Sequence, residues 1–266
     1  MTTPVALTIA GSDSSGGAGI QADLKTFAAF GVYGASVITA LTAQNTKGVS
    51  GIHQVASEFV TAQIDAVFDD LRVGAVKIGM VGQLTTIDAL AAALGRWSPR
   101  NIVLDPVMIA TSGDRLLRPD DVEALRTKLV PRVSLITPNL PEAAALLDEP
   151  LARSEAAIES QGKRLIAMGC PAILITGGHG QGTESVDYLI RDSGMLALAR
   201  PRIATKNTHG TGCSLSSAIA AGLAKGEQLE TAVRNAKNWV SAAIAAADRL
   251  GIGSGHGPIH HFHRFY

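Results

Sequence analysis

Short apolar runs alternate with longer helical stretches between residues 5 and 175, and few folds accommodate such a pattern. The apolar runs contain few polar residues, which is typical of strands that are covered on both faces. They lie at 5–10, 36–40, 75–79, 102–104, 134–136 and 172–175. The helical stretches lie at 19–30, 57–71, 85–95, 119–129, 140–147 and 154–168. The alternation predicts an α/β fold, in which right-handed crossovers place helices against a mostly parallel central sheet.

The pattern changes after residue 185. Residues 186–190 and 195–198 predict two antiparallel strands at an edge of the sheet, and two long helices follow at about 211–225 and 229–249. A chain of 266 residues can bury a substantial core, and this one contains neither a Pro- or Ser-rich linker nor a clear repeat. We therefore expect a single domain over residues 1–266.

Charge and cysteine content exclude several classes of protein. The 23 basic residues equal the 23 acidic ones, so the basic stripe of a nucleic-acid-binding protein is not expected. No apolar run approaches the ~20 residues that span a bilayer. Cys170 and Cys213 lie in separate motifs, which favours a reducing compartment over a disulfide framework. We expect a cytoplasmic protein without a signal peptide that binds neither nucleic acid nor membrane.

Residues that could bind a ligand or take part in catalysis stand at the carboxyl ends of the predicted strands. In open parallel sheets, ligands bind at this edge, outside the ends of the strands. The residues found there are Gly11, Gln44, Met80, Asp105, Asn139 and Thr176. Their convergence predicts a binding site at the carboxyl edge of the sheet.

The segment Asn207–Cys213 stands directly before a predicted helix and indicates an anion site. Gly210 and Gly212 allow backbone N–H groups to approach an anion, and the helix adds unpaired N–H donors and the positive end of its dipole. The same field would stabilise a thiolate at Cys213. An anion cradle beside an activated base suggests phosphoryl transfer. Because the chain has no G-x-x-x-x-G-K-[ST] loop, this turn would have to hold the phosphates.

Two other enzyme classes stay open from the residues alone. Residues 17–22 fit the G-x-G-x-x-A form of the dinucleotide fingerprint, as in an NAD(P)-dependent oxidoreductase. That class needs an acidic residue about 20 positions later, yet no Asp or Glu lies between Asp23 and Glu58. Cys213 could also be a hydrolase nucleophile, although no G-x-C-x-G elbow surrounds it.

Seven blocks of sequence carry a resemblance to a known family. They lie at 10–23, 43–46, 77–80, 104–108, 136–143, 207–213 and 257–263. In this order they resemble the hydroxymethylpyrimidine/phosphomethylpyrimidine kinases of thiamine biosynthesis, which belong to the ribokinase-like superfamily, and they span essentially the whole chain. The resemblance implies a three-layer ribokinase-like sandwich and a homodimer. It also implies an ATP- and Mg²⁺-dependent kinase that phosphorylates 4-amino-5-hydroxymethyl-2-methylpyrimidine and then its monophosphate. A pyridoxine/pyridoxal kinase is the nearest alternative.

The resemblance also suggests roles for individual residues. Catalysis would involve the base Cys213 together with the turn residues Gly210, Thr211 and Gly212. The pyrimidine would contact Gly11, Asp23, Gln44, Met80 and Val107. Mg²⁺ and the γ-phosphate would lie near Asp105 and Glu142. The nucleotide would contact Asn139, Thr176, Thr208 and Lys237.

Two of these positions have further features. Asn139 with Glu142 also fits a helix-capping box, and a capping role is compatible with a role near the metal. Thr176 stands where family members often have a lysine, and threonine cannot supply that charge. Lys237 is the candidate replacement, against the simpler expectation of an exposed helical lysine.

Overall fold

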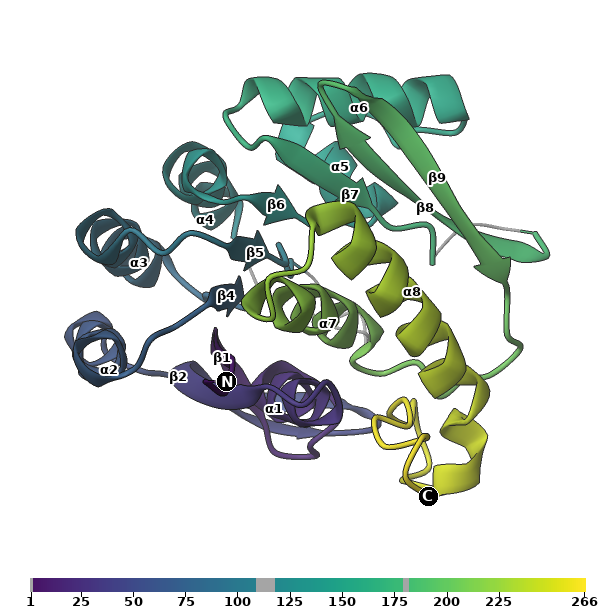
Figure 1. Cartoon of the computed structure of the whole chain (residues 1–266), viewed down its shortest axis with the longest axis horizontal. Coiled ribbons are helices and arrows are strands. Elements are labelled where there is room, and N and C mark those ends of the chain that lie inside the picture. Colours follow the sequence, from purple (N-terminus) through teal and green to yellow (C-terminus); the bar gives the residue numbers. More distant parts are fainter. Residues whose placement is uncertain (1, 109–117, 179–181) are drawn as a thin grey trace.

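One sheet organises the structure, a computed structural model that describes residues 2–108, 118–178 and 182–266 (Figure 1). In these residues, nine strands are hydrogen-bonded in the order β3-β2-β1-β4-β5-β6-β7-β8-β9. Neighbouring strands from β2 to β7 in this order run parallel, whereas β3, β8 and β9 pair antiparallel. The strands are β1 (Val5–Asp13), β2 (Tyr33–Asn45), β3 (Gly48–Gln54), β4 (Ala75–Ile78), β5 (Ile102–Leu104), β6 (Leu135–Ile136), β7 (Ala172–Ile175), β8 (Glu184–Arg191) and β9 (Gly194–Pro201).

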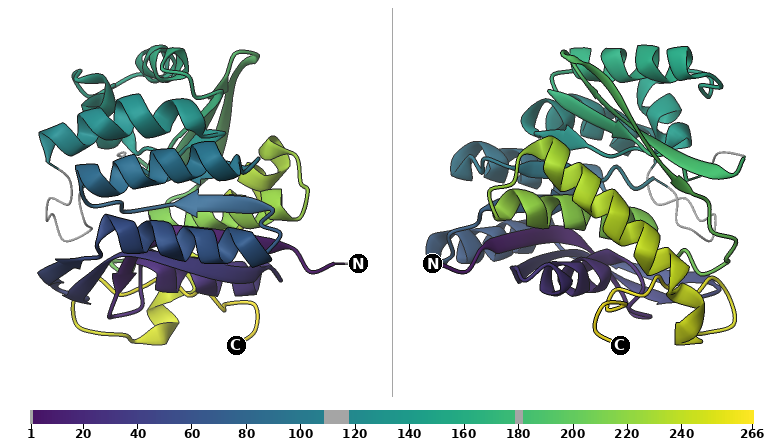
Figure 2. Two further views of the ribbon diagram at one scale, coloured as in Figure 1. Left: turned by 90° about the vertical axis from the view of Figure 1, so that its left-hand side faces the viewer. Right: turned by 45° about the vertical axis from the view of Figure 1, so that its right-hand side comes forward.

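Helices cover both faces of the sheet, which gives three layers (Figures 1 and 2). One face carries α1 (Gly19–Ala29), α7 (Thr211–Ala224) and α8 (Leu229–Ala245). The opposite face carries α2 (Ser57–Asp70), α3 (Leu84–Trp97), α4 (Pro119–Ala124), α5 (Leu140–Leu147) and α6 (Glu155–Ala167). The predicted three-layer α/β architecture is confirmed.

Side chains that alternate between the two faces of the sheet form two apolar cores, one under each layer of helices. Val76 and Ile78 of β4 belong to the same apolar cluster as Ile87 of α3. Ala75 points to the other face and belongs to the cluster that contains Leu215 of α7. Because successive side chains of a strand alternate between faces, an apolar run such as β4 supplies both cores at once.

Two elements differ from the sequence prediction. Strand β3 was not predicted, because Gly48–Gln54 lies at the sheet edge, is largely exposed and lacks an apolar run. The predicted helix 119–129 is α4 followed by a π-helical turn (Leu125–Leu129) and a 3-10 turn that contains Pro131. Proline lacks the N–H that would continue an α-helix.

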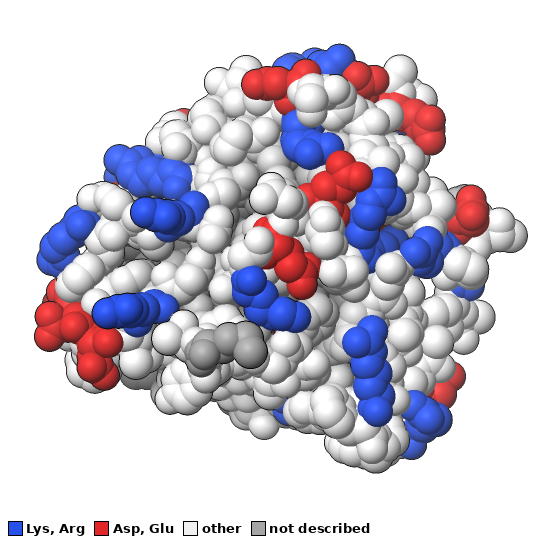
Figure 3. All heavy atoms as spheres, viewed as in Figure 1, with Lys and Arg blue, Asp and Glu red and all other residues white. Residues whose placement is uncertain are grey.

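Acidic and basic side chains are interspersed on the face of the molecule drawn in Figure 3. Among the described residues, no helix combines the length and the apolarity needed to cross a bilayer.

A buried ion pair joins the sheet to the layer of α1 and α7. Lys77 of β4 is fully buried, with Nζ 2.9 and 3.0 Å from the two carboxylate oxygens of Asp23 in α1. Thr8 of β1 and Ser217 of α7 donate further hydrogen bonds to the same carboxylate, at 2.6 and 2.7 Å. Burial alone lowers the pKa of Lys77, but the negative charges of its neighbours outweigh it and raise that pKa above the usual value. Four elements therefore meet at one charged pair.

Removal of the Lys77 charge is predicted to destabilise the fold. Lys77→Met should lower the free energy of unfolding in a urea titration by about 3–5 kcal/mol, because it leaves an uncompensated buried carboxylate. Adding Asp23→Asn should recover part of this loss, because the remaining amide is neutral. Lys163→Met is the matched control: Lys163 pairs with Glu159 on the surface of α6, and its loss should cost less than ~1 kcal/mol. Equal costs for the two lysines would contradict the interpretation.

Candidate active site

The phosphate-binding turn predicted at 207–213 has the required backbone geometry. Gly210 is the N-cap of α7 and has a φ of 77°, in the left-handed region that favours glycine. A Cβ at Gly210 would lie 1.9 Å from the carbonyl oxygen of Gly17, so the close approach of the two loops also requires glycine. Thr211 begins the helix and hydrogen-bonds the carbonyl oxygen of Thr208 through both its N–H (3.2 Å) and its hydroxyl (2.7 Å). The helix N-terminus, with the positive end of its dipole, thus lies at this turn.

Cys213 lies on that first turn, where burial and neighbouring charges act on the pKa of its thiol. Burial raises the pKa of Cys213 to about 12, and the charges of Asp105 and Asp23 contribute to the rise. Lys77 and a hydrogen bond with the backbone of Gly19 act in the opposite direction and are outweighed. In the protein without ligands, burial and these carboxylates therefore oppose the thiolate that the helix terminus is expected to stabilise.

Asp105 follows β5 directly and faces the same turn. Its Oδ2 lies 3.8 Å from the position that a Cβ on Gly212 would occupy, and it accepts a hydrogen bond from the hydroxyl of Ser216 at 3.2 Å. Burial raises the pKa of Asp105 to about 6, although the charge of Lys77 opposes this shift. The turn and a carboxylate thus adjoin, as the strand-end pattern predicted.

Glu142 is buried near Asp105 and forms the predicted capping box at the start of α5. Its Oε2 accepts a hydrogen bond from Asn139 N–H, while Asn139 Oδ1 accepts one from Glu142 N–H, both at 2.9 Å. Burial and the charge of Asp105 raise the pKa of Glu142 to about 8.

The two carboxylates fit a divalent cation. Mg²⁺ prefers oxygen ligands, and it is commonly held by one or two carboxylates together with substrate phosphates and water. In the part of the chain that the structure describes, no group of three or more His, Cys, Asp or Glu side chains forms a metal cage. Asp105 and Glu142 repel each other in a buried setting, and a cation between them would relieve that repulsion.

The predicted acceptor-binding residues lie at the ends of the neighbouring strands. Met80 lies over the backbone of Gly11, because a Cβ there would be 2.5 Å from the Met80 Cε. The Gln44 Oε1 accepts a hydrogen bond from the Thr42 hydroxyl at 3.1 Å. Val107 is half-buried just beyond Asp105. These positions are compatible with one wall of a pocket.

Asp23 is placed differently from the other predicted acceptor residues. Its side chain is fully buried, and its carboxylate already bonds Lys77, Thr8 and Ser217. A direct contact with a substrate ring would require one of these partners to be released.

Three predicted nucleotide-binding residues, Asn139, Thr176 and Lys237, are linked by backbone and side-chain contacts. Asn139 and Thr176 form an isolated parallel bridge. Lys237 is buried rather than exposed, with Nζ 2.8 Å from Asp187 Oδ2. The other oxygen of Asp187 accepts the N–H of Gly177 at 3.0 Å, directly after Thr176. Lys237 is therefore already paired with a carboxylate.

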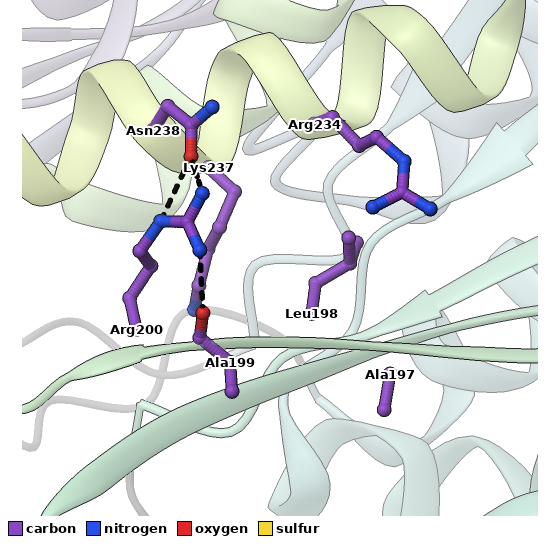
Figure 4. A pocket seen from close by; sticks show the side chains of 7 residues that line it. All are labelled: Ala197, Leu198, Ala199, Arg200, Arg234, Lys237 and Asn238. Carbon is purple, nitrogen blue, oxygen red and sulfur yellow. Dashed lines mark hydrogen bonds between the residues drawn. The ribbon is translucent and has the colours of Figure 1, made fainter.

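A pocket of about 150 Å³ lies between β9 and α8 (Figure 4). Lys237 lines it together with Arg234 and Asn238 of α8 and with residues 197–200 of β9. The residues of the turn and the acidic groups Asp105 and Glu142 do not line it, and Lys237 is the predicted site residue among its lining residues.

The Gly-rich loop before α1 does not support the dinucleotide alternative. The N–H groups of Gly17 and Ala18 donate to Asp13 Oδ2, at 3.0 and 2.8 Å. A dinucleotide fold would direct such amides at a pyrophosphate, whereas here a carboxylate of the chain itself accepts them.

Sequence analysis missed Asp13, His209 and Lys77 as site residues. The His209 Nε2 lies 2.8 Å from Asp13 Oδ2, and Lys77 is the charged partner of Asp23. A signal existed for Lys77, since a lone lysine in an apolar strand is buried only when it is paired. Asp13 could have been recognised from Asp-Ser-Ser-Gly, because aspartate commonly accepts backbone N–H groups in such turns.

Comparisons with known proteins agree with this geometry. A sequence model of the phosphomethylpyrimidine kinase family matches residues 13–260. The hydroxymethylpyrimidine/phosphomethylpyrimidine kinase of Salmonella typhimurium is 55% identical over 261 residues, which cover 98% of each chain.

Two solved structures have the same fold. An ADP complex of Bacillus subtilis pyridoxal kinase has a TM-score of 0.92 at 34% identity and covers 100% of both chains. A phosphomethylpyrimidine kinase from Clostridium difficile has a TM-score of 0.81 at 42% identity, covering 91% of this chain and 100% of that one. The fold is thus ribokinase-like, and the chain belongs to the phosphomethylpyrimidine kinase family.

Proposed function

We propose that this protein transfers the γ-phosphoryl group of ATP to 4-amino-5-hydroxymethyl-2-methylpyrimidine, and then transfers a second one to the resulting monophosphate, for thiamine diphosphate biosynthesis. The observation that carries the proposal is the glycine turn at the start of α7, which adjoins Cys213 and the Asp105 carboxylate in a chain of this kinase family. Such an arrangement can hold phosphates and accept a proton within one turn of helix.

In this proposal the turn holds the phosphates. The N–H groups at the start of α7 and the positive end of its dipole face the β- and γ-phosphates, with Gly210, Thr211 and Gly212 forming the cradle. Thr208, Asn139, Thr176 and Lys237 contact the nucleotide. Asp105 and Glu142 would hold Mg²⁺, and the bound ion would supply positive charge against the phosphates.

Gln44 selects the acceptor. Its carboxamide offers a donor and an acceptor, which match the edge of an aminopyrimidine. Gly11, Met80 and Val107 line the ring pocket. Asp23 either contacts the ring or, through its ion pair with Lys77, contributes to the charge balance of the site.

Cys213 accepts the proton of the acceptor hydroxyl during transfer. Its pKa of about 12 in the free protein means that the thiol must become more acidic when the substrates bind. Lys77 already favours the thiolate, whereas the charges of Asp105 and Asp23 oppose it. A cation that offsets the Asp105 charge therefore shifts the thiol in the required direction. Asp105, with a pKa of about 6, is the competing candidate for the base.

One site performs both transfers. Of the two cysteines in the sequence, Cys213 is the one on the glycine turn of α7, and the ring can be held by the same residues in either step. The second acceptor is already an anion, so repulsion from the γ-phosphate makes the cationic groups of the site more important in that step.

A pyridoxine/pyridoxal kinase is the second candidate function. It is favoured by the likeness to the Bacillus subtilis pyridoxal kinase structure, at 34% identity. Pyridoxal also carries a hydroxymethyl group on a flat heterocycle, so the same transfer chemistry would apply.

We further infer that residues 1–266 act as one kinase domain, that the protein is cytoplasmic and that it is a homodimer. Cys170 and Cys213 are both free, which suits a reducing compartment. Leu41, Ile52 and Phe59 are exposed apolar side chains of β2, β3 and α2, and a second copy could cover part of this region.

Parallel turnover assays test the substrate assignment. The purified protein, Mg²⁺ and ATP are incubated with the hydroxymethylpyrimidine, with its monophosphate or with pyridoxal, and the products are identified by mass spectrometry. Both pyrimidines should be phosphorylated, and the hydroxymethylpyrimidine should give the highest kcat/KM of the two unphosphorylated alcohols. A higher kcat/KM for pyridoxal would reverse the assignment.

Replacement of the cysteine tests the proposed base. Cys213→Ala should lower kcat by about 10²-fold or more, the usual scale for loss of an acid–base group, with little change in ATP binding. Cys213→Asp should recover part of the activity, because a carboxylate can also accept the proton. A Cys213→Ala enzyme with near-normal kcat would assign the proton to another group, and Asp105 would then be tested.

A further inference from the structure

The two loops that would meet at the reacting groups are linked by one carboxylate. Asp13 ends β1, and its Oδ2 accepts hydrogen bonds from Gly17 N–H and Ala18 N–H within its own loop. The same oxygen lies 2.8 Å from the Nε2 of His209, which belongs to the phosphate-binding turn. Both side chains are nearly inaccessible, with exposed fractions of 3% for Asp13 and 7% for His209.

The direction of this hydrogen bond follows from the charge on Asp13. Burial alone raises the pKa of Asp13, but the hydrogen bonds from His209, Ser15 and the loop backbone outweigh it and lower the pKa to about 2. Asp13 is therefore ionised at neutral pH and can only accept, so the His209 Nε2 carries a proton and donates it. The Gln44 Nε2 lies 3.4 Å from the same nitrogen, which has no lone pair left to accept from it. The Gln44 amide N–H groups thus remain available to a ligand.

Close packing fixes the same two loops. A Cβ at Gly17 would lie 2.3 Å from the His209 Cδ2, so the imidazole rests directly on the glycine backbone. The C-terminal tail holds the other side of His209, whose N–H donates to Gly257 O at 3.0 Å and whose carbonyl accepts from Ile259 N–H at 3.4 Å. His209 therefore has little freedom to move away from the loop.

Electrostatics explain why a carboxylate is needed at this place. Helices α1 and α7 begin at Gly19 and Thr211, and both of these N-termini adjoin the Asp13–His209 contact. Converging positive ends of two helices repel each other. An ionised carboxylate between them offsets this repulsion and lets the two loops approach.

We propose that Asp13 and His209 form a positioning latch, which holds the acceptor-side loop against the phosphate-binding turn and so aligns the acceptor hydroxyl with the γ-phosphate. The proposal rests on the phosphoryl transfer proposed above. In this proposal, neither Asp13 nor His209 contacts a reacting atom. Loss of the latch therefore lowers the rate of transfer and leaves the binding of each substrate largely intact.

The test compares variants of the two residues in steady-state assays with the hydroxymethylpyrimidine and ATP. His209→Ala should lower kcat by about 10²-fold, the loss that a misplacement of about 1 Å can cause. KM for both substrates should stay within about threefold, because only the transfer geometry is lost. His209→Gln should recover most of the rate, since its amide nitrogen can donate from nearly the position of Nε2.

Three further variants separate the latch from a general structural role. Asp13→Asn should lower kcat as His209→Ala does, and the double variant should be no slower than the worse single variant, because both remove one interaction. Gly17→Ala displaces the imidazole without removing a polar group and should also lower kcat. Ser15→Ala is the matched control: its hydroxyl bonds the other Asp13 oxygen within the same loop, so kcat should stay near that of the wild type.

Several results would overturn the latch: multiplicative losses in the double variant, an effect on KM alone, no recovery in His209→Gln, or a normal kcat in Gly17→Ala. Thermal unfolding of each variant identifies any that fails to fold, and in that case the kinetics of His209→Gln and Gly17→Ala decide between the latch and a structural role. A wild-type enzyme that phosphorylates no alcohol would defeat the proposed function itself, and the latch with it.

Discussion

The buried positive charge of Lys77 is the interaction on which the rest of the structure depends. It lies in the centre of the sheet, on the face covered by α1 and α7, and its direct partner is the carboxylate of Asp23. Asp105 and the thiol of Cys213 are close enough to influence its pKa. One cation thus balances the acidic groups of an interior from which water is largely excluded. Breaking such a pair is costly, because the remaining charge has no water to solvate it.

The same charge balance connects the fold to the chemistry. Burial and the charge of Asp23 raise the pKa of Asp105, burial and the charge of Asp105 raise that of Glu142, and the Cys213 thiol is held neutral for a related reason. The free protein therefore carries carboxylates that favour a cation beside a helix terminus that favours an anion. A nucleotide with its divalent ion satisfies both preferences at once. This complementarity gives a physical reason for phosphoryl transfer at the carboxyl edge of the sheet.

Much of this arrangement could be predicted from local sequence patterns. The apolar runs located the parallel strands, and the known rule for ligands in open sheets led from strand ends to Asp105. The glycines before α7 predicted the turn, and Asn139 with Glu142 predicted the capping box. Each of these features depends on residues that are close together in the chain or on a general rule of the fold.

The features that were missed depend on contacts between distant segments. Asp13 and His209 are 196 residues apart, and nothing local to either shows that the loops meet. The carboxylates that act on the Cys213 thiol were missed for the same reason. The helix terminus is visible in the sequence, whereas the burial and the facing carboxylate of Asp105 are not. Edge strand β3 was missed because its residues lack the apolar pattern that marks buried strands.

The most direct test of this charge balance is the pH dependence of alkylation of Cys213 by iodoacetamide in the free protein. Mass spectrometry separates the label on Cys213 from any on the buried Cys170, and Cys213→Ser serves as the blank. If burial and the carboxylates hold the thiol neutral, the rate should still rise with pH at about pH 10 without a plateau, as expected for a pKa of about 12. A half-maximal rate at or below about pH 8.5, the value of an ordinary thiol, would contradict it.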